Sequence, residues 1–169
     1  MHPTASLHEA VRKNRRSSID RHVQSGADVD AVDEEGQTAL HVATRYAMEN
    51  INLSLIELGA DVHIKDASGR TALHHAAMEG KCDVVRRLLA KSANVNELDE
   101  QSNTPLHMAA GLNGPSRYEV AEVLLQWRGD IHTVNQMGYT PTGVAIDMGS
   151  MDVVELMQAR GGRRESTGE

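Results

Sequence analysis

The chain has 169 residues, of which 40% are hydrophobic and 24% are charged, the balance of an ordinary folded protein. Its formal net charge of −7 disfavours general nucleic-acid binding, because that function needs a basic face to offset the phosphates. Aromatic residues contribute only 2%, fewer than an enzyme pocket or a conventional globular core normally uses. We therefore expect a core of alanine, leucine, valine and methionine between closely packed helices.

The N-terminal sequence MHPTASLHEAVRKNRRSS lacks the apolar core of a secretory signal. No segment approaches the roughly 18 apolar residues that a membrane-spanning helix needs. Cys82 is the only cysteine, so the chain forms no internal disulfide and requires no oxidising compartment. We expect an intracellular protein, cytoplasmic with the nucleus as the alternative, that binds no membrane.

One stretch of sequence recurs along the chain in the forms GQTALHVA, GRTALHHAA, SNTPLHMAA and GYTPTGVA. Its threonines are 33, 33 and 36 residues apart, at Thr38, Thr71, Thr104 and Thr140. A second string recurs with the same separations as SGADVD, LGADVH, KSANVN and WRGDIH. Both strings shift by three residues in the same interval, so we expect an insertion between them, in GLNGPSR at 111–117.

A period of 33 residues that carries T-P-L-H-x-A resembles the ankyrin repeat, and the resemblance covers about residues 5 to 161. It implies an all-α solenoid of about five helix–turn–helix units with short β-hairpin-like turns. We number the expected units as unit 1 (1–32, an N-terminal capping repeat), unit 2 (33–65), unit 3 (66–98), unit 4 (99–134, with the three-residue insertion) and unit 5 (135–162, a C-terminal capping repeat), followed by a flexible tail (163–169).

The residue types within a unit suit two short helices. Thr104 followed by Pro105 suits a helix start, because the hydroxyl accepts from a free backbone N–H and proline is tolerated in the first turn. Gly80 suits the end of a first helix in a left-handed conformation. The string DVVRRLLA, at 83–90, places valine and leucine on one stripe of a second helix. Helices this short are not stable alone, so the units must stack.

The two end units carry polar residues at positions that are apolar elsewhere. Ser18 and His22 stand in unit 1 where unit 3 has Val84 and Leu88. In unit 5, Gln158 takes the place of a leucine. Polar outer faces are what the terminal units of a solenoid need, so these substitutions predict caps.

The repeated histidines raise the question of a metal site. The resemblance implies a structural role instead for six residues: Thr38, His41, Thr71, His74, Thr104 and His107. Neighbouring units lie about 10 Å apart, too far for their imidazoles to share one zinc ion. His75 aligns with Val42 and Met108, at a position that faces the next unit or the groove, so packing is favoured over ligation. We expect no metal and no cofactor.

Catalytic chemistry has one weak candidate. Cys82 offers a thiol nucleophile, but it aligns with variable surface positions early in the second helix, which favours a bystander. The sequence contains no G-x-S-x-G and no G-x-x-x-x-G-K-[ST] motif. We therefore expect no enzymatic activity.

The resemblance implies that a protein partner binds on the concave face, formed by the turn tips and the exposed side of the first helices. Carried over by position, the candidate partner-binding residues are Glu34, Glu35, Arg45, Tyr46, Arg70, Met78, Glu79, Glu100, Leu112, Met137 and Tyr139. Tyrosine and methionine are favoured at interface cores, although single exposed apolar residues are also normal on any surface. The acidic tips favour a partner with a basic or extended segment.

Two further features have open alternatives. The basic cluster of Arg12, Lys13, Arg15, Arg16 and Arg21 is interpreted as a solvated cap face, with a docking site for an acidic group or nucleic acid as the alternative. LLAKSANVN resembles substrates of an asparaginyl hydroxylase that acts on ankyrin repeats, which makes Asn96 a modification candidate.

The whole chain therefore predicts a monomeric, non-enzymatic adaptor or scaffold. The alternative is a regulatory inhibitor that occludes an enzyme or a transcription factor.

Overall fold

The structure is a computed structural model that describes residues 3–46 and 48–165. In that part of the chain it contains ten α-helices and no strand. In chain order the helices are α1 (Pro3–Arg12), α2 (Arg16–Gln24), α3 (Ala39–Arg45), α4 (Glu49–Glu57), α5 (Ala72–Met78), α6 (Cys82–Ala90), α7 (Pro105–Ala110), α8 (Ser116–Gln126), α9 (Pro141–Asp147) and α10 (Met151–Glu165). The predicted all-α class is confirmed.

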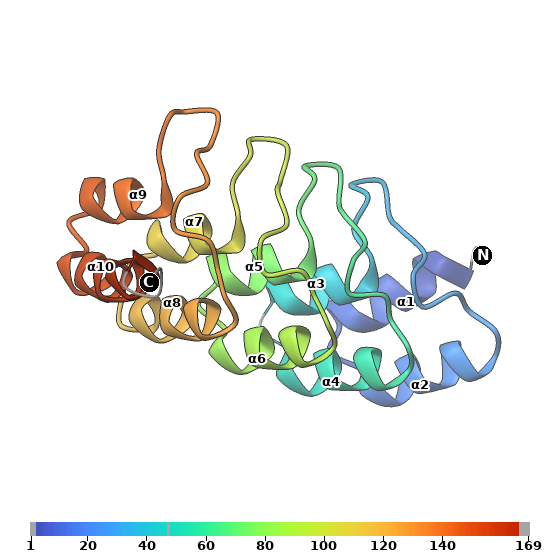
Figure 1. Cartoon of the computed structure of the whole chain (residues 1–169). Helices are drawn as coiled ribbons and strands as arrows, with labels where there is room; N and C mark the ends of the chain where they lie inside the picture. The colour runs from blue at the N-terminus through green and yellow to red at the C-terminus, as the bar shows by residue number, and fades with distance from the viewer. Residues whose placement is uncertain (1–2, 47, 166–169) are drawn as a thin grey trace.

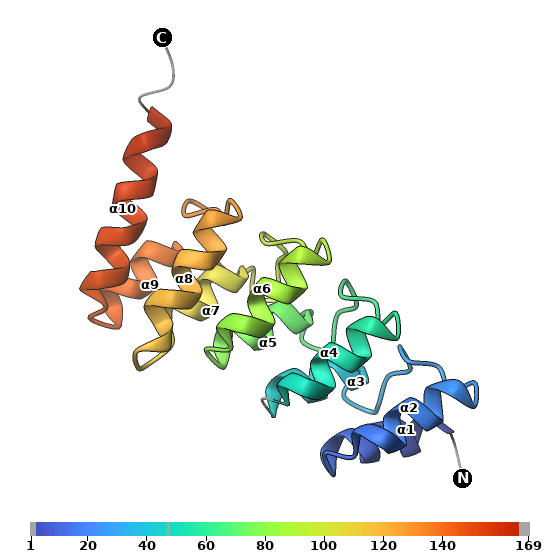
Figure 2. The same cartoon turned by 90° about the horizontal axis from the view of Figure 1, so that it is seen from below.

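The helices form two parallel layers that run the length of the molecule. Figure 1 shows the odd-numbered helices in one row and the even-numbered helices in a second row beneath it, with long turns rising above the first. Seen from below, the even-numbered helices lie side by side in chain order (Figure 2). The N-terminal and C-terminal units lie at opposite ends of the array, and this arrangement confirms the predicted solenoid.

Alanine and leucine fill the space between the layers. Leu40, Leu73 and Leu106, at one repeat position, are at most 1% exposed. Ala76 and Ala109 are fully buried, and their small side chains let α5 and α7 approach closely. An isolated helix of six or seven residues, the length of α3, α5, α7 and α9, is unstable in water. Stacking therefore supplies the stability that a single unit lacks.

The turn tips are held by an acidic or amide side chain at their base. In unit 3, Asp66 Oδ1 accepts from the backbone N–H groups of Ser68 and Arg70 at 2.9 and 3.0 Å. Each tip also bonds to the next, as where Glu100 N–H donates to Ser68 O at 3.1 Å. Gly69, with φ +72°, approaches the following tip so closely that a Cβ there would lie 2.8 Å from Glu100 N. The tips therefore form a continuous row.

The sequence predicts an insertion of three residues at 111–117 in unit 4, and the connection between the two helices of that unit lies there. The connection between α7 and α8 covers 111–115, against 79–81 between α5 and α6, and α8 has 11 residues against 9 in α6. Gly114, with φ +104°, turns the chain within this connection. The insertion therefore lengthens the end of the unit away from the tips.

The C-terminal helix runs further than the sequence indicates. At the equivalent positions Gly59, Ser92 and Arg128, a positive φ turns the chain out of the second helix. Gly161 makes no such turn, and α10 continues to Glu165, past the expected boundary of unit 5 at 162. The expected flexible tail from 163 is therefore helical up to Glu165, and 166–169 lie outside the described residues.

Candidate functional site

A ladder of histidines joins successive units. The Nε2 atoms of His8, His41, His74 and His107 each lie 2.8–3.1 Å from a backbone oxygen of the following unit, namely Gln37, Arg70, Asn103 and Tyr139. In units 2, 3 and 4 the histidine Nδ1 accepts from the backbone N–H of its own N-cap threonine, at 3.1–3.2 Å. The rings of His41, His74 and His107 therefore form hydrogen bonds through both nitrogens, which leaves neither nitrogen available to a metal.

Burial favours the neutral form of these rings. It lowers the pKa of His74 from 6.5 to about 4, even though the carbonyl of Asn103 favours the charged form. Burial also lowers the pKa of His41 and of His107. Because the backbone N–H of the N-cap threonine donates to Nδ1, a second proton on that nitrogen would displace this hydrogen bond. The ladder therefore requires neutral imidazoles with the proton on Nε2.

His75 is buried, but its contact is a hydrogen bond to a carboxylate and not the apolar packing that its repeat position suggests. Its Nε2 lies 2.7 Å from Asp66 Oδ2, and both side chains are 5% exposed. Burial alone would raise the pKa of Asp66, but the hydrogen bonds from His75, Arg70 N–H and Ser68 N–H lower it, so the carboxylate is ionised. The ring of His75 also meets the ring of His41 edge to face, with centroids 5.7 Å apart. The pair fastens the tip of unit 3 to α5.

Most of the candidate partner-binding residues lie on the concave face, defined here as the turn tips together with the outer side of α3, α5, α7 and α9. Tyr46 ends α3 and is 57% exposed. Met137 and Tyr139 lie on the tip of unit 5 and are 77% and 38% exposed. Five acidic or basic candidates are also exposed: Glu34, Glu35, Arg45, Glu79 and Glu100. Arg45 and Glu35 face each other, with Nη1 and Oε2 3.9 Å apart.

Three candidates are less available than the sequence suggests. Arg70 is partly buried, and its Nε lies 3.3 Å from Oδ2 of Asp99, whose side chain is buried. Leu112 is partly buried because it packs beside Gly80, where an added Cβ would lie 3.0 Å from Leu112 Cδ2. Met78 is also only partly exposed. The side chains of Arg70 and Leu112 therefore already contact other residues of the chain.

A groove crosses the C-terminal part of the concave face and has a volume of about 250 Å³. Its apolar lining comes from α7, the tip of unit 5 and α9: Met108, Met137, Tyr139, Val144 and Met148. Its polar lining is Arg70, Asn103, His107, Asn135 and Asp147. Sequence reasoning placed Met137 and Tyr139 at the partner surface, but it did not join them to Met108 and Val144. The available signal was that Met108 and Val144 share a repeat position.

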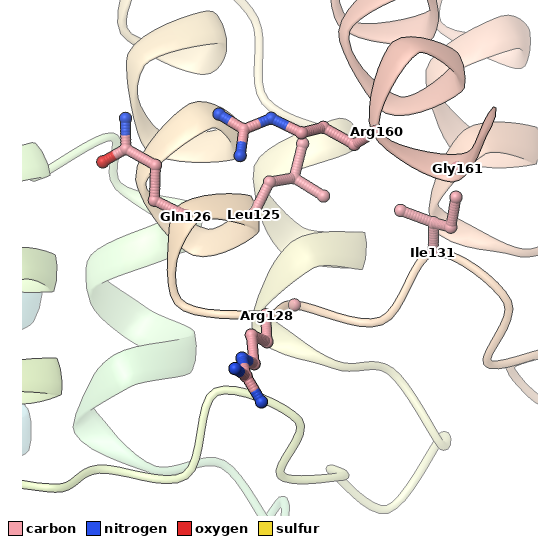
Figure 3. Close-up of a pocket in the computed structure, with 7 residues that line it drawn as sticks. Leu125, Gln126, Arg128, Ile131, Arg160 and Gly161 are labelled. Atoms are coloured by element: carbon pink, nitrogen blue, oxygen red, sulfur yellow. The ribbon is translucent and has the colours of Figure 1, made fainter. Parts of the chain in front are cut away.

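A second, larger pocket of about 600 Å³ lies between the end of α8 and α10. Figure 3 shows its lining: Leu125, Gln126, Arg128, Ile131, Arg160 and Gly161. Arg128 and Arg160 extend in different directions and do not converge on a common point (Figure 3). The pocket therefore lacks the paired donors that would hold an anion, and its position on the side of the even-numbered helices separates it from the concave face.

The remaining chemical candidates have ordinary surroundings. Burial raises the pKa of the Cys82 thiol, which opposes formation of a reactive thiolate. Over the residues that the structure describes, no group of three or more His, Cys, Asp and Glu side chains has the arrangement to hold a metal ion. The Asn96 side chain is exposed and contacts the next unit, donating to Arg128 O at 3.2 Å and accepting from Asp130 N–H at 2.8 Å.

The basic cluster near the N-terminus is partly offset within the chain. Arg12 Nη2 lies 2.9 Å from Asp33 Oδ2, and Lys13 pairs with Glu9. None of the helices in the described ranges has the length and apolar composition to cross a membrane.

Comparison with models of known protein families gives a match. The profile of a family described as "Ankyrin repeats (3 copies)" matches residues 7–99 and 46–135, which together span well over half of the chain. No curated protein matches the sequence.

Proposed function

Because the chain belongs to the ankyrin repeat family, we propose that it is a non-enzymatic adaptor or scaffold that binds a partner protein on its concave face. Ankyrin repeats are in general protein–protein interaction modules. The proposal specifies the concave face as the binding surface and an adaptor or scaffold as the role. The observation that carries it is the exposure of Tyr46, Met137 and Tyr139 on this face, since none of the three is required by the repeat pattern.

The scaffold supports such a role because it presents these side chains without reorganisation. The row of bonded tips and the histidine ladder fix each unit against the next. A rigid surface loses little conformational entropy on binding, so more of the contact energy becomes affinity. The exposed carboxylates of Glu34, Glu35 and Glu100 would attract a basic partner and speed its association.

The test begins with affinity capture of the partner by the full chain, followed by binding kinetics with the purified partner. Tyr46→Ala and Tyr139→Ala should each weaken binding by about 1–3 kcal/mol, mainly through faster dissociation. Removing the charges of Glu34, Glu35 and Glu100 should slow association and reduce its salt dependence. Trp127→Ala is the matched control, since Trp127 is 47% exposed at the end of α8, on the other layer.

Two outcomes would count against the proposal. If both tyrosine variants bind like the parent while Trp127→Ala loses binding, the partner uses the other layer. If the captured partner is an enzyme or transcription factor whose activity falls when the chain is added, the chain is an inhibitor and not an adaptor, because an adaptor leaves its partner active.

A further inference from the structure

The groove in units 4 and 5 has the chemistry of a site for one apolar side chain beside a positive charge. We propose that it binds an extended segment of a partner protein through a single large apolar residue with a lysine or arginine close to it in sequence. The inference rests on the proposed function and specifies which part of the concave face provides the anchor and what the partner must carry.

The repeat itself provides an internal comparison for the groove residues. The equivalents of Met137 are polar in the three preceding units: Glu35, Ser68 and Gln101. The equivalents of Tyr139 are likewise polar: Gln37, Arg70 and Asn103. The scaffold is thus built three times without an apolar side chain at either position. Unit 5 places both side chains on one side of a groove. A ligand that covered them would remove their apolar surface from water, which is favourable.

The tip that carries Met137 and Tyr139 is held in place by hydrogen bonds within the tip and to the preceding unit. Asn135 Oδ1 accepts from the backbone N–H of Met137 and of Tyr139, both at 3.0 Å. His107 Nε2 lies 3.1 Å from Tyr139 O, and Gln136 N–H donates to Gln101 O at 2.9 Å. The groove therefore exists before a ligand arrives, and ordering it costs a ligand little.

The polar side chains of the groove bond to one another. Arg70 Nε and Asn103 Nδ2 each lie 3.3 Å from Asp99 Oδ2, and Asn135 Nδ2 donates to Asn103 Oδ1 at 2.8 Å. An apolar side chain can therefore enter without leaving these groups unpaired, which would be the main cost of burying them. The volume of about 250 Å³ is below that of a typical small-molecule site and suits a side chain.

The charge that remains at the groove is negative. The guanidinium of Arg70 is offset by the buried carboxylate of Asp99. Asp147 lines the groove and Glu100 stands on the neighbouring tip, and both are exposed. Neither carboxylate forms a salt bridge with another residue of the described ranges. A lysine or arginine beside the apolar anchor would meet these two groups, whereas an acidic segment would be repelled.

The experiment selects a random 12-residue peptide library, displayed on phage, against the full 169-residue chain. The enriched peptides are then synthesised with a fluorescent label and titrated by anisotropy. We expect them to share a large apolar residue next to lysine or arginine. The variant Met137→Ser/Tyr139→Asn/Met148→Glu introduces the residues of preceding units and should weaken binding by about thirtyfold or more. Asp147→Asn should weaken binding by about threefold and reduce its salt dependence.

The controls separate this inference from the proposed function. Thermal unfolding of the triple variant should match the parent, because the exchanged positions tolerate the same polar residues in other units. If no peptide is enriched, or enriched peptides bind the triple variant like the parent, the groove is not the anchor site. If binding is instead lost in Tyr46→Ala, the groove is not the anchor site but the partner still binds the concave face. If binding is lost only in Trp127→Ala, both the groove inference and the proposed function are wrong.

Discussion

His74 in unit 3 donates from Nε2 to the carbonyl oxygen of Asn103 in unit 4 at 3.1 Å, while its Nδ1 accepts from Thr71 N–H at 3.2 Å. One neutral ring thus caps its own helix and joins two units. Asn103 is the residue before the N-cap of α7, so the bond fixes the start of the next helix. The stability of this contact depends on the protonation state of the imidazole.

The first prediction concerns acid stability. The pKa of His74 is about 4 in the folded chain against 6.5 for a solvated imidazole, so the unfolded chain binds the proton more tightly. Stability is therefore full above about pH 6.5 and falls as the pH drops towards 4. Between pH 7 and 5 this one group should remove roughly 2 kcal/mol of the free energy of unfolding. Urea denaturation at the two pH values measures the loss of unfolding free energy between them. This loss should be smaller in His74→Gln than in the parent by about 2 kcal/mol. The exposed His63→Gln is the control, and an unchanged drop in His74→Gln would refute the assignment.

The second prediction concerns the buried pair of His75 and Asp66. His75→Val introduces the residue that unit 2 has at Val42, yet it should lower the free energy of unfolding by about 1–3 kcal/mol. The reason is that Asp66 Oδ2 stays buried and loses its partner. Met108→Val at the equivalent position of unit 4 should cost less than about 1.5 kcal/mol, because Met108 has no ionic partner to leave behind. Equal costs would show that His75 acts only by packing.

The third prediction compares two glycines with similar backbone angles. Gly69 has φ +72° and Gly138 has φ +84°, so alanine is strained at both by about 1–2 kcal/mol. A Cβ at Gly69 would also lie 2.8 Å from Glu100 N, whereas a Cβ at Gly138 has nothing within 4 Å. Gly69→Ala should therefore be about 1–3 kcal/mol more destabilising than Gly138→Ala. Denaturant midpoints with equal m-values provide the measurement, and a larger loss at Gly138 would contradict the stacking of the tips.

The fourth prediction concerns a buried amide in α4. Asn52 is fully buried and its Nδ2 has no partner within the described residues. Asn52→Val introduces the residue of unit 3 at Val85, and the Thr44 hydroxyl keeps its bond to Leu40 O at 2.8 Å. We expect a gain of about 1 kcal/mol and a higher thermal midpoint, because a desolvated donor is removed. The reverse change, Val85→Asn, should destabilise, and a lower midpoint for Asn52→Val would show that the amide is needed.

The fold of this protein can be predicted from its sequence because each unit contacts only its neighbours. The 33-residue spacing of Thr38, Thr71 and Thr104 places the helix starts, and the structure has an N-cap at each of them. The end of α10 is the exception, since glycines that elsewhere accompany a turn lie inside a helix there. A glycine at the end of the second helix is thus compatible with a turn or with a continued helix, and the sequence pattern alone does not distinguish the two.

The sequence alone determined the repeat and the two short helices of each unit, because both follow from periodicity. The face on which a partner is expected came from the resemblance to ankyrin repeats that the periodicity revealed. Only the tertiary structure decided what equivalent positions do in different units. His75 pairs with Asp66, whereas its equivalent Met108 lines a groove with Met137 and Tyr139. Alignment by repeat treats these positions alike, since it records the residue type at each position and not the side chains that surround it. Those side chains decide which groups are buried and which remain available to a partner.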